Sequence, residues 1–243
     1  MTVGVSQVVF ADDGSSSGTG NIATTQAATL TVTSGNALWC VTGADTSFSP
    51  NISGVSDSVN GSWGTILDAA IVDGNGNKTG AFAKANAGAG STVVTTTFSI
   101  GCGYKVIAVA EISGVTASPL DGHVGGNVQN LPGTGTDAIV SGTATNATQP
   151  ALVVALCYNS EGASGVTPTV GTGFTSAGSG WALGFGVAGA RVESKRVTAA
   201  GGNIAKFTSS INNHFVTHVA VFDESTNFIS SWMSDNQFPV FIT

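Results

Sequence analysis

Charged side chains are scarce in this chain. Asp, Glu, Lys and Arg make up 9% of its 243 residues, against roughly 25% in average soluble proteins. Only seven residues are Lys or Arg, the formal net charge is −7, and Lys195-Arg196 is the one basic pair. A basic stripe that neutralises phosphates is therefore not expected, and we expect no nucleic-acid partner.

Cysteine is also rare, with Cys40, Cys102 and Cys157 as its three positions. An odd number of cysteines without close spacing matches neither a disulfide framework nor a zinc site. Each lies in or beside an apolar run, which predicts small buried side chains and no bound metal or cofactor. One alternative stays open: Cys40 and Cys157 hold nearly corresponding places in the two halves of the chain, so that pair is a candidate disulfide.

Long apolar runs are missing. No run approaches the ~18 residues that a membrane helix needs, so we expect no membrane span. Residues 1–14 lack the charged start and the long apolar centre of a secretory signal. No window sustains the 3.6-residue period of an amphipathic helix, which predicts few and short helices.

Catalytic motifs are missing as well. The G-x-S-x-G pattern occurs only as GSSSG at residues 14–18, in the expected polar Gly/Ser-rich arm and without the flanking strand and helix of a nucleophile turn, and no H-E-x-x-H frame surrounds His214 and His218. Glycoside hydrolysis needs two carboxylates that face each other across a groove. Spacing selects no pair among the available ones, which are Asp68, Glu111, Asp121, Glu193, Asp223 and Glu224. We therefore expect a protein that is not an enzyme.

What the chain does contain is an internal repeat. Ala37-Leu38 aligns with Ala151-Leu152, residues 87–90 align with 199–202, and residues 109–111 align with 221–223. The offset of about 110 residues is far longer than a solenoid repeat. Each half is thus a β unit of its own, and the two units are expected to close on each other.

Strand patterns dominate both halves, as short runs of β-branched and apolar residues bounded by Gly, Asn, Asp, Ser or Pro. In residues 214–222 the even-numbered side chains, such as Val216 and Phe222, share one face and the odd-numbered ones share the other. The expected strands are 3–10, 28–33, 37–42, 65–72, 81–85, 93–100, 104–112, 138–143, 151–158, 181–187, 191–198, 203–209 and 214–222.

These features predict an all-β fold, an antiparallel jelly-roll β-sandwich built from two similar four-strand halves. The alternative is two separate smaller sandwiches in tandem. Residues 115–136 are interpreted as a crossover inside one domain, because they contain Val124, Val128 and Leu131. The expected parts are an N-terminal strand and polar arm (1–27), the sandwich (28–223) and an apolar docking tail (224–243).

The tail carries the candidate site residues. It follows the last repeat strand and contains Trp232, Phe238, Val240 and Phe241, which match nothing in the first half. Exposed apolar surface of that extent marks an interaction site. We expect these four side chains to be buried against another subunit.

Several motifs together resemble a known group of domains: NALWCVTGA, GSWGTILDAAI, AKANAGAGSTVVTTTFS, YKVIAVAEISGV, SPLDG, PALVVAL and GTGFT. Over residues 28–223 they are similar to jelly-roll β-sandwich domains of tailed-bacteriophage virion proteins. That resemblance implies a capsid decoration (cement) protein, a head fibre or a tail component, and no catalytic residues. Bacterial members of the group resemble surface or carbohydrate-binding modules. The Trp39-Cys40 pair and the aromatic tail depart from the group's pattern.

Three functions remain as hypotheses. The first is a structural virion protein on the capsid surface, bound to the major capsid protein or other virion subunits and forming a homo-oligomer, with a trimer favoured. The second is a glycan- or receptor-binding module that uses Trp63, Trp181 or Trp232. The third is a glycoside hydrolase or lyase on a jelly-roll scaffold.

Overall fold

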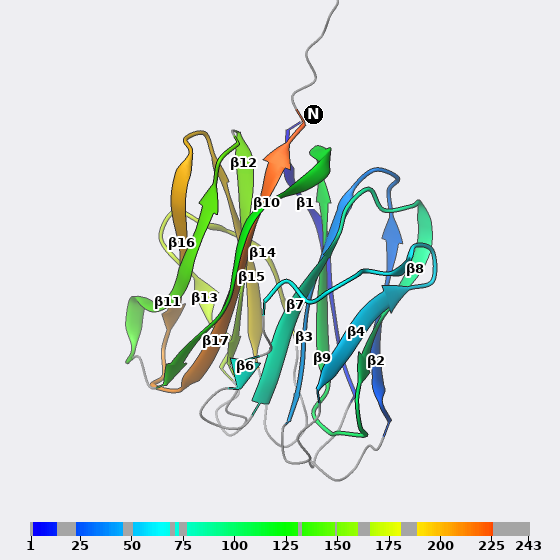
Figure 1. Cartoon of the computed structure of the whole chain (residues 1–243). Helices are drawn as coiled ribbons and strands as arrows, with labels where there is room; N and C mark the ends of the chain where they lie inside the picture. The colour runs from blue at the N-terminus through cyan, green and yellow to red at the C-terminus, as the bar shows by residue number, and fades with distance from the viewer. Residues whose placement is uncertain are drawn as a thin grey trace, which may run out of the picture.

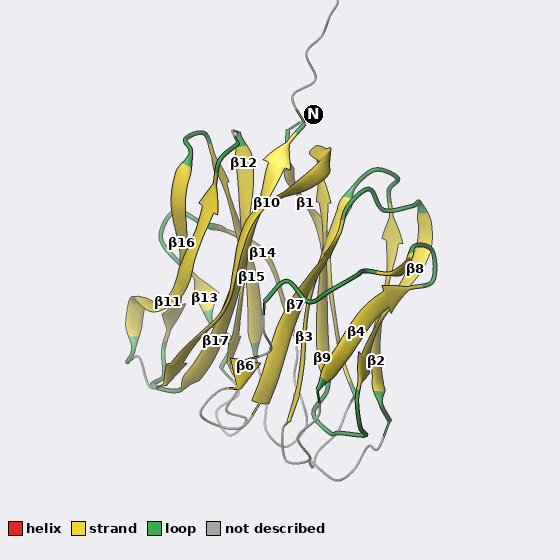
Figure 2. Cartoon of the chain, in the orientation of Figure 1, coloured by secondary structure: helices red, strands yellow, loops and turns green. Residues whose placement is uncertain are grey.

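The computed structural model describes residues 2–13, 23–45, 51–68, 71–72, 77–130, 133–148, 150–159, 166–180 and 189–225. In these ranges all regular secondary structure is β-strand, arranged in four antiparallel sheets (Figures 1 and 2). The expected all-β antiparallel sandwich with two similar halves is confirmed. The tail residues Trp232, Phe238, Val240 and Phe241 lie outside the described residues, so their docking stays a prediction.

The first half contains two sheets. We call the five-stranded one inner sheet one; its order is β1 (Gly4–Asp12), β9 (Val106–Ser113), β3 (Ala37–Asp45), β7 (Asn77–Lys84) and β6 (Ile71–Val72). Outer sheet one has the order β2 (Thr25–Val32), β8 (Gly90–Phe98), β4 (Ile52–Asp57) and β5 (Gly61–Ser62).

The second half repeats this plan. Inner sheet two has the order β10 (Val115–Asn130), β17 (His214–Glu224), β12 (Ala151–Asn159), β15 (Ala190–Val197) and β14 (Thr175–Gly180). Outer sheet two has the order β11 (Gly135–Asn146), β16 (Gly201–Ser209) and β13 (Thr169–Val170). The order β1-β9-β3-β7 thus matches β10-β17-β12-β15. The sequence predicted four main strands in each half; each half instead has a five-stranded inner sheet and a separate outer sheet, so each is a jelly-roll sandwich in itself.

The four sheets stack as layers, with the inner sheets facing each other in the middle (Figure 1). Three apolar cores separate the layers. The first-half core contains Leu38, Phe82 and Val94, and the second-half core contains Ile139, Val153 and Phe207. The central core joins both jelly rolls, so the two sandwiches form one body and are not separate units in tandem.

The central core pairs small side chains with large ones. Inner sheet one presents four alanines beside Val41, Val106 and Ile112, with Trp39 as its one aromatic residue of less than 9% exposure; the alanines are Ala37, Ala81, Ala108 and Ala110. Inner sheet two presents four large buried side chains, Leu152, Leu156, Tyr158 and Phe222. Small residues opposite large ones allow two sheets to interdigitate at the density of a protein interior.

Strand β14 shows the same principle at the edge of the stack. This strand, TSAGSG, lacks the apolar or alternating pattern of a β-strand and was not among the strands predicted from the sequence. A Cβ at Gly180 would lie 2.3 Å from the ring of Phe10, and one at Gly178 would lie 3.2 Å from Val8. These glycines leave room for two side chains of β1 from the other half, because only a residue without Cβ permits so close an approach.

The repeat alignment needs one correction. Residues 109–111 correspond to 221–223 as predicted, because Ala110 and Phe222 both face the central core. In β3 and β12, however, Trp39 pairs with Ala110 while Leu152 pairs with Phe222. Trp39 therefore corresponds to Leu152, and the predicted match of Leu38 with Leu152 is wrong by one residue. A slip of one residue moves a side chain to the opposite face of a strand.

Two further predictions about the chain path change, and one is untested. The crossover predicted over residues 115–136 is wrong, because residues 115–130 form β10, which pairs with β17. Of the strand predicted at 65–72, only Ile71–Val72 is β-structure among the described residues. The strand predicted at 181–187 lies outside the described residues.

The cysteines are all free and buried. Cys40 lies in the first-half core and Cys157 in the second-half core, with the central core between them. The suggested bridge between these two is therefore wrong. Burial raises the pKa of both thiols well above the usual range, so neither forms a reactive thiolate near neutral pH.

The central core makes the two halves unfold together, and one strand offers a matched test. Phe222 of β17 faces inner sheet one, whereas Phe215 of the same strand faces outer sheet two; both are fully buried. We expect Phe222→Ala and Phe215→Ala each to lower the free energy of unfolding by about 3–5 kcal/mol. Phe222→Ala should also split the single calorimetric transition into two, because it loosens only the contact between the halves. A Phe222→Ala transition as cooperative as that of Phe215→Ala contradicts this assignment.

Candidate functional site

The start, the middle and the end of the described chain meet at one end of the stack. Strand β9 ends at Ser113 and β10 begins at Val115, so Gly114 alone links the two jelly rolls. Gly114 has a φ of +71°, and a Cβ there would lie 2.6 Å from the carbonyl oxygen of Thr2. Its own carbonyl accepts a hydrogen bond of 2.7 Å from the Ser225 amide. We call this region the junction end; the N-terminus lies there as well (Figure 1).

The last residues of β17 are fixed at the junction end. The Glu224 amide donates to the carbonyl of Pro150 at 3.0 Å, and Arg196 Nε donates to Glu224 Oε2 at 2.5 Å. The ion pair reaches across β12, because Arg196 and Phe222 flank Leu152 in the sheet. The backbone that leads to residues 226–243 therefore leaves the stack at a defined point.

A shallow hollow of about 430 Å³ opens beside Ser225. Hydroxyl groups, amides and bare backbone line it. Its residues are Ser6, Thr33, Ser34, Gly35, Asn36, Ser113, Gly114, Val115 and Ser225. The hollow thus spans both jelly rolls and the residue at which the described chain ends.

A buried carboxylate organises the first-half side of this end. Glu111, 2% exposed, accepts hydrogen bonds from the Thr33 amide and from Asn36 Nδ2, each at 2.7 Å, and from Gln7 Nε2 at 2.5 Å. These donors come from the turn between β2 and β3 and from β1. These three hydrogen bonds compensate the burial of the carboxylate, so Glu111 fastens that turn to the inner sheet.

At the corresponding place in the second half, two carboxyl groups take the position of one. Asp223 corresponds to Glu111, but its neighbour is Asp121, a bulge residue of β10 whose side chain hydrogen-bonds to that of Asp223. Asp121 Oδ2 accepts from the amides of Ala147 and Thr148 at 2.7 and 2.8 Å, which fastens the turn between β11 and β12. Burial, and then the charge of Asp121, raise the pKa of Asp223 to about 6. Two carboxyl groups in contact share a proton because both cannot ionise cheaply.

This pair makes the second half less stable as pH rises from the acid range towards neutral. The folded-state pKa of Asp223 is raised, so its stabilising contribution is complete below the unfolded pKa near 3.8 and is lost as pH rises through about 6. Asp223→Asn copies the amide–carboxylate arrangement of Gln7 and Glu111. At pH 8 it should stabilise the protein by about 1 kcal/mol, after allowance for solvent screening.

The control is Glu224→Gln, which removes a neighbouring surface carboxylate and should leave the pH dependence unchanged. Urea unfolding at pH 5 and at pH 8 measures both variants. Equal effects of Asp223→Asn at the two pH values contradict the shared proton.

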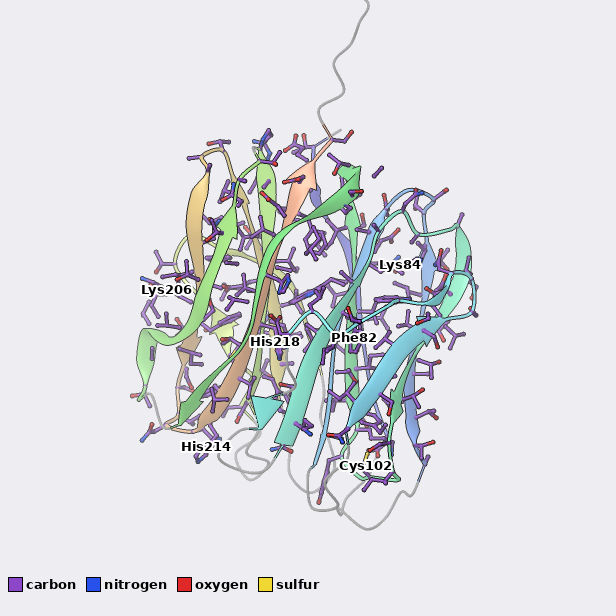
Figure 3. The ribbon with its side chains drawn as sticks, viewed as in Figure 1. Phe82, Lys84, Cys102, Lys206, His214 and His218 are labelled. Carbon is purple, nitrogen blue, oxygen red and sulfur yellow. The ribbon has the colours of Figure 1, made fainter. Side chains whose placement is uncertain are left out.

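A second titratable group lies inside the central core. His218 on β17 is 0% exposed, and its Nε2 lies 3.0 Å from Thr79 Oγ1 on β7, while its Nδ1 has no partner among the described residues (Figure 3). Burial lowers its pKa to about 4. The nearby surface pair is His123 and Asp68, with Nδ1 and Oδ1 2.8 Å apart. Since Thr79 and His218 are both buried, no substrate reaches them, and the contact is structural.

His218 predicts a loss of stability in mild acid. Its folded-state pKa is lowered, so its contribution is complete above the unfolded pKa near 6.5 and is lost as pH falls towards 4, by up to about 3 kcal/mol. His218→Leu should flatten the unfolding free energy over that pH range. His123→Gln, the exposed-histidine control, should leave the slope unchanged. If the unfolding free energy of His218→Leu depends on pH as steeply as that of wild type, His218 is not the cause of the acid sensitivity.

The structure separates the other carboxylates that the sequence offered for catalysis. Asp68 pairs with His123, Glu111 fastens its turn and Glu224 pairs with Arg196. Glu193 is buried in the second half, where its Oε2 accepts from the Gly171 amide at 2.9 Å, and burial raises its pKa to about 7. Asp121 and Asp223 do meet, but they touch, whereas a retaining glycosidase holds its carboxyl groups about 5 Å apart.

The structure excludes one of the three tryptophans named for the glycan-binding hypothesis. Trp63 is 7% exposed, and its Nε1 donates to Asp57 Oδ2 at 2.6 Å, so it is part of the turn after β4 and not of a sugar-binding face. Trp181 and Trp232 lie outside the described residues. Among the residues that the structure describes, no group of three or more His, Cys, Asp and Glu side chains is placed to hold a metal ion.

Comparisons with family models, with curated proteins and with solved structures found no match. The resemblance to bacteriophage virion domains therefore remains a prediction. No helix in the described part of the chain has the length and apolarity of a membrane span. Sequence reasoning missed the junction end, although its signal, the E-I-S-G-V run that ends one repeat and begins the next, was present.

Proposed function

We propose that the chain is a non-enzymatic structural protein of a bacteriophage particle, a capsid decoration (cement) protein that stabilises the head. The observation that supports this most is the fixed exit of the chain at the junction end. The end of β17 is held there by the Arg196–Glu224 ion pair and by the bonds to Pro150 and Gly114. An attachment segment is useful on a large assembly when a rigid body carries it in a defined direction.

The body suits such a role. Its two jelly rolls share one central core and a single linking residue, so the stack moves as one unit. Its surface carries few charges and many Ser, Thr, Asn and Gly residues. The sequence resemblance to virion domains points the same way, and the partners in this proposal are the major capsid protein or other virion subunits.

The tail supplies the attachment. Trp232, Phe238, Val240 and Phe241 give a short segment a large apolar surface. Burial of a large apolar side chain contributes roughly 1.5–3 kcal/mol before the cost of ordering the chain. Four such side chains are enough to retain a subunit on a lattice that offers many equivalent sites.

The test is a truncated protein that lacks residues 226–243. It should fold and stay soluble, because the anchoring bonds of Glu224 and Ser225 remain, and it should fail to join particles assembled in its presence. Trp232→Ala with Phe241→Ala should have the same effect, whereas Asn236→Ala should not. Copy number in purified particles, measured by quantitative mass spectrometry, is the readout.

Two outcomes speak against the proposal. Unfolding of the truncated protein places the tail in the chain's own core. A copy number far below the number of capsid lattice sites assigns the protein to the tail of the particle, and saturable binding to a glycan array then favours the carbohydrate-binding alternative.

A further inference from the structure

Strand β2 forms one edge of outer sheet one. It pairs with β8 on one side, and the sheet order places no strand on the other. Its pairing with β8 runs from Thr25 to Val32 through eight consecutive pairs without a register shift. Thus a full, straight strand borders the sheet.

The hydrogen-bonding groups of the open side can be assigned. In an antiparallel ladder the N–H and C=O of one residue point the same way, and the direction alternates along the strand. The Phe98 amide donates to Thr24 O at 2.7 Å, so even-numbered residues of β2 face β8. Gln7 Nε2 donates to Thr31 O at 2.5 Å from the other side, as this alternation requires.

Within the described part of the chain, the middle of the edge is therefore unpaired. Gln7 covers Thr31, but no described residue bonds to the outward N–H and C=O of Ala27 and Thr29. Such a row of free groups is a template for another strand, and proteins usually block it with a charge, a proline or a bulge.

Strand β2 has none of these blocks. Its sequence, TQAATLTV, contains no charged residue and no proline. The other long edges are protected: β1 has a bulge between Val5 and Gln7, and β10 has three register shifts and carries Asp121. On β11 the pairing with β16 is interrupted twice.

The surface beside the edge is uncharged as well. The outward side chains of β2 are Thr25, Ala27, Thr29 and Thr31, and their exposed neighbours on β8 are Ser91, Val93 and Thr97. Beneath the edge, Val9 and Ala11 of β1 are only partly buried against the first-half core. A strand added beside β2 thus meets hydroxyl groups and methyl groups but no charge.

We propose that this edge pairs with the β2 edge of a second copy of the chain, antiparallel about a two-fold axis, so that outer sheet one continues across a dimer. The outward groups of both copies belong to odd-numbered residues, so Ala27 of one copy faces Thr29 of the other. Both copies then keep their threonines on the solvent side and Leu30 on the core side. Because the strand is uncharged, no like charges meet at the axis, and the contact is isologous and closed.

This symmetry differs from the trimer expected from the sequence, and the proposal does not depend on the role in a virion. Equilibrium sedimentation of the full chain over a range of concentrations tests it. The wild-type chain should reach twice the monomer mass of 24.0 kDa, and the Thr29→Pro variant should remain at the monomer mass. Proline removes the outward N–H of residue 29, and edge strands tolerate it.

A second variant and a control keep the result interpretable. Ala27→Lys places a charge on the edge and should also give a monomer. Val93→Lys places the same charge on the same face, opposite Thr29 but in the central strand β8, and should leave the dimer intact. Hydrogen exchange at Ala27 and Thr29 should slow as wild type is concentrated and stay fast in Ala27→Lys.

Three outcomes overturn the proposal. These are a wild type that stays monomeric at every concentration, a trimer, and an oligomer that survives both edge variants. An oligomer that disappears only when residues 226–243 are removed assigns self-association to the tail and also overturns it.

Discussion

The whole fold depends on the contact between the two inner sheets, which leaves both faces of each of them buried. A sheet that is covered on one face needs apolar residues at every second position, but a sheet covered on both faces needs them at nearly every position. Strand β12, ALVVALCYN, is buried at all nine positions, and β17 is buried at eight of eleven. This explains how a chain with so many Ser, Thr and Gly residues still has a mean hydropathy of +0.28: the apolar residues are concentrated in the strands of the middle layers.

Burial on both faces also determined which strands could be predicted from the sequence. Strands such as β3, β12 and β17 were found because their apolar runs are long and flanked by turn residues. Strand β14 was missed because TSAGSG packs against β1 through its glycines, and β4 was missed because ISGVSD has only two large apolar side chains, Ile52 and Val55. The repeat alignment of β3 with β12 was wrong by one residue, since a strand buried on both sides carries no alternation that sets its register.

The candidate site was harder to predict for a related reason. Glu111 and Asp223 were matched by the repeat, but their neighbours were not, because Asp121 reaches Asp223 through a bulge in β10. A bulge redirects a side chain without leaving a sequence signal. The result is a molecule whose halves share a backbone plan and differ in electrostatics: Glu111 alone fastens the turn of the first half, whereas in the second half Asp121 fastens the turn and also contacts Asp223, whose pKa is raised. His218 adds the opposite pH dependence between the halves, because its contribution is lost as pH falls towards 4 whereas that of Asp223 is lost as pH rises through about 6.

The single-residue link has a consequence for biosynthesis. The first jelly roll is complete at Ser113, before the second has been made, and one face of its inner sheet then presents Trp39, Val41 and Ile112 to solvent. At 5–20 residues per second a ribosome needs roughly 5–20 s to deliver the remaining repeat. For that time the nascent chain exposes a surface that binds any copy of the second half. The Gly114 link favours the correct partner, because it keeps the second half of the same chain at a high effective concentration. A longer connection would lower this advantage and would permit exchange of halves between neighbouring chains.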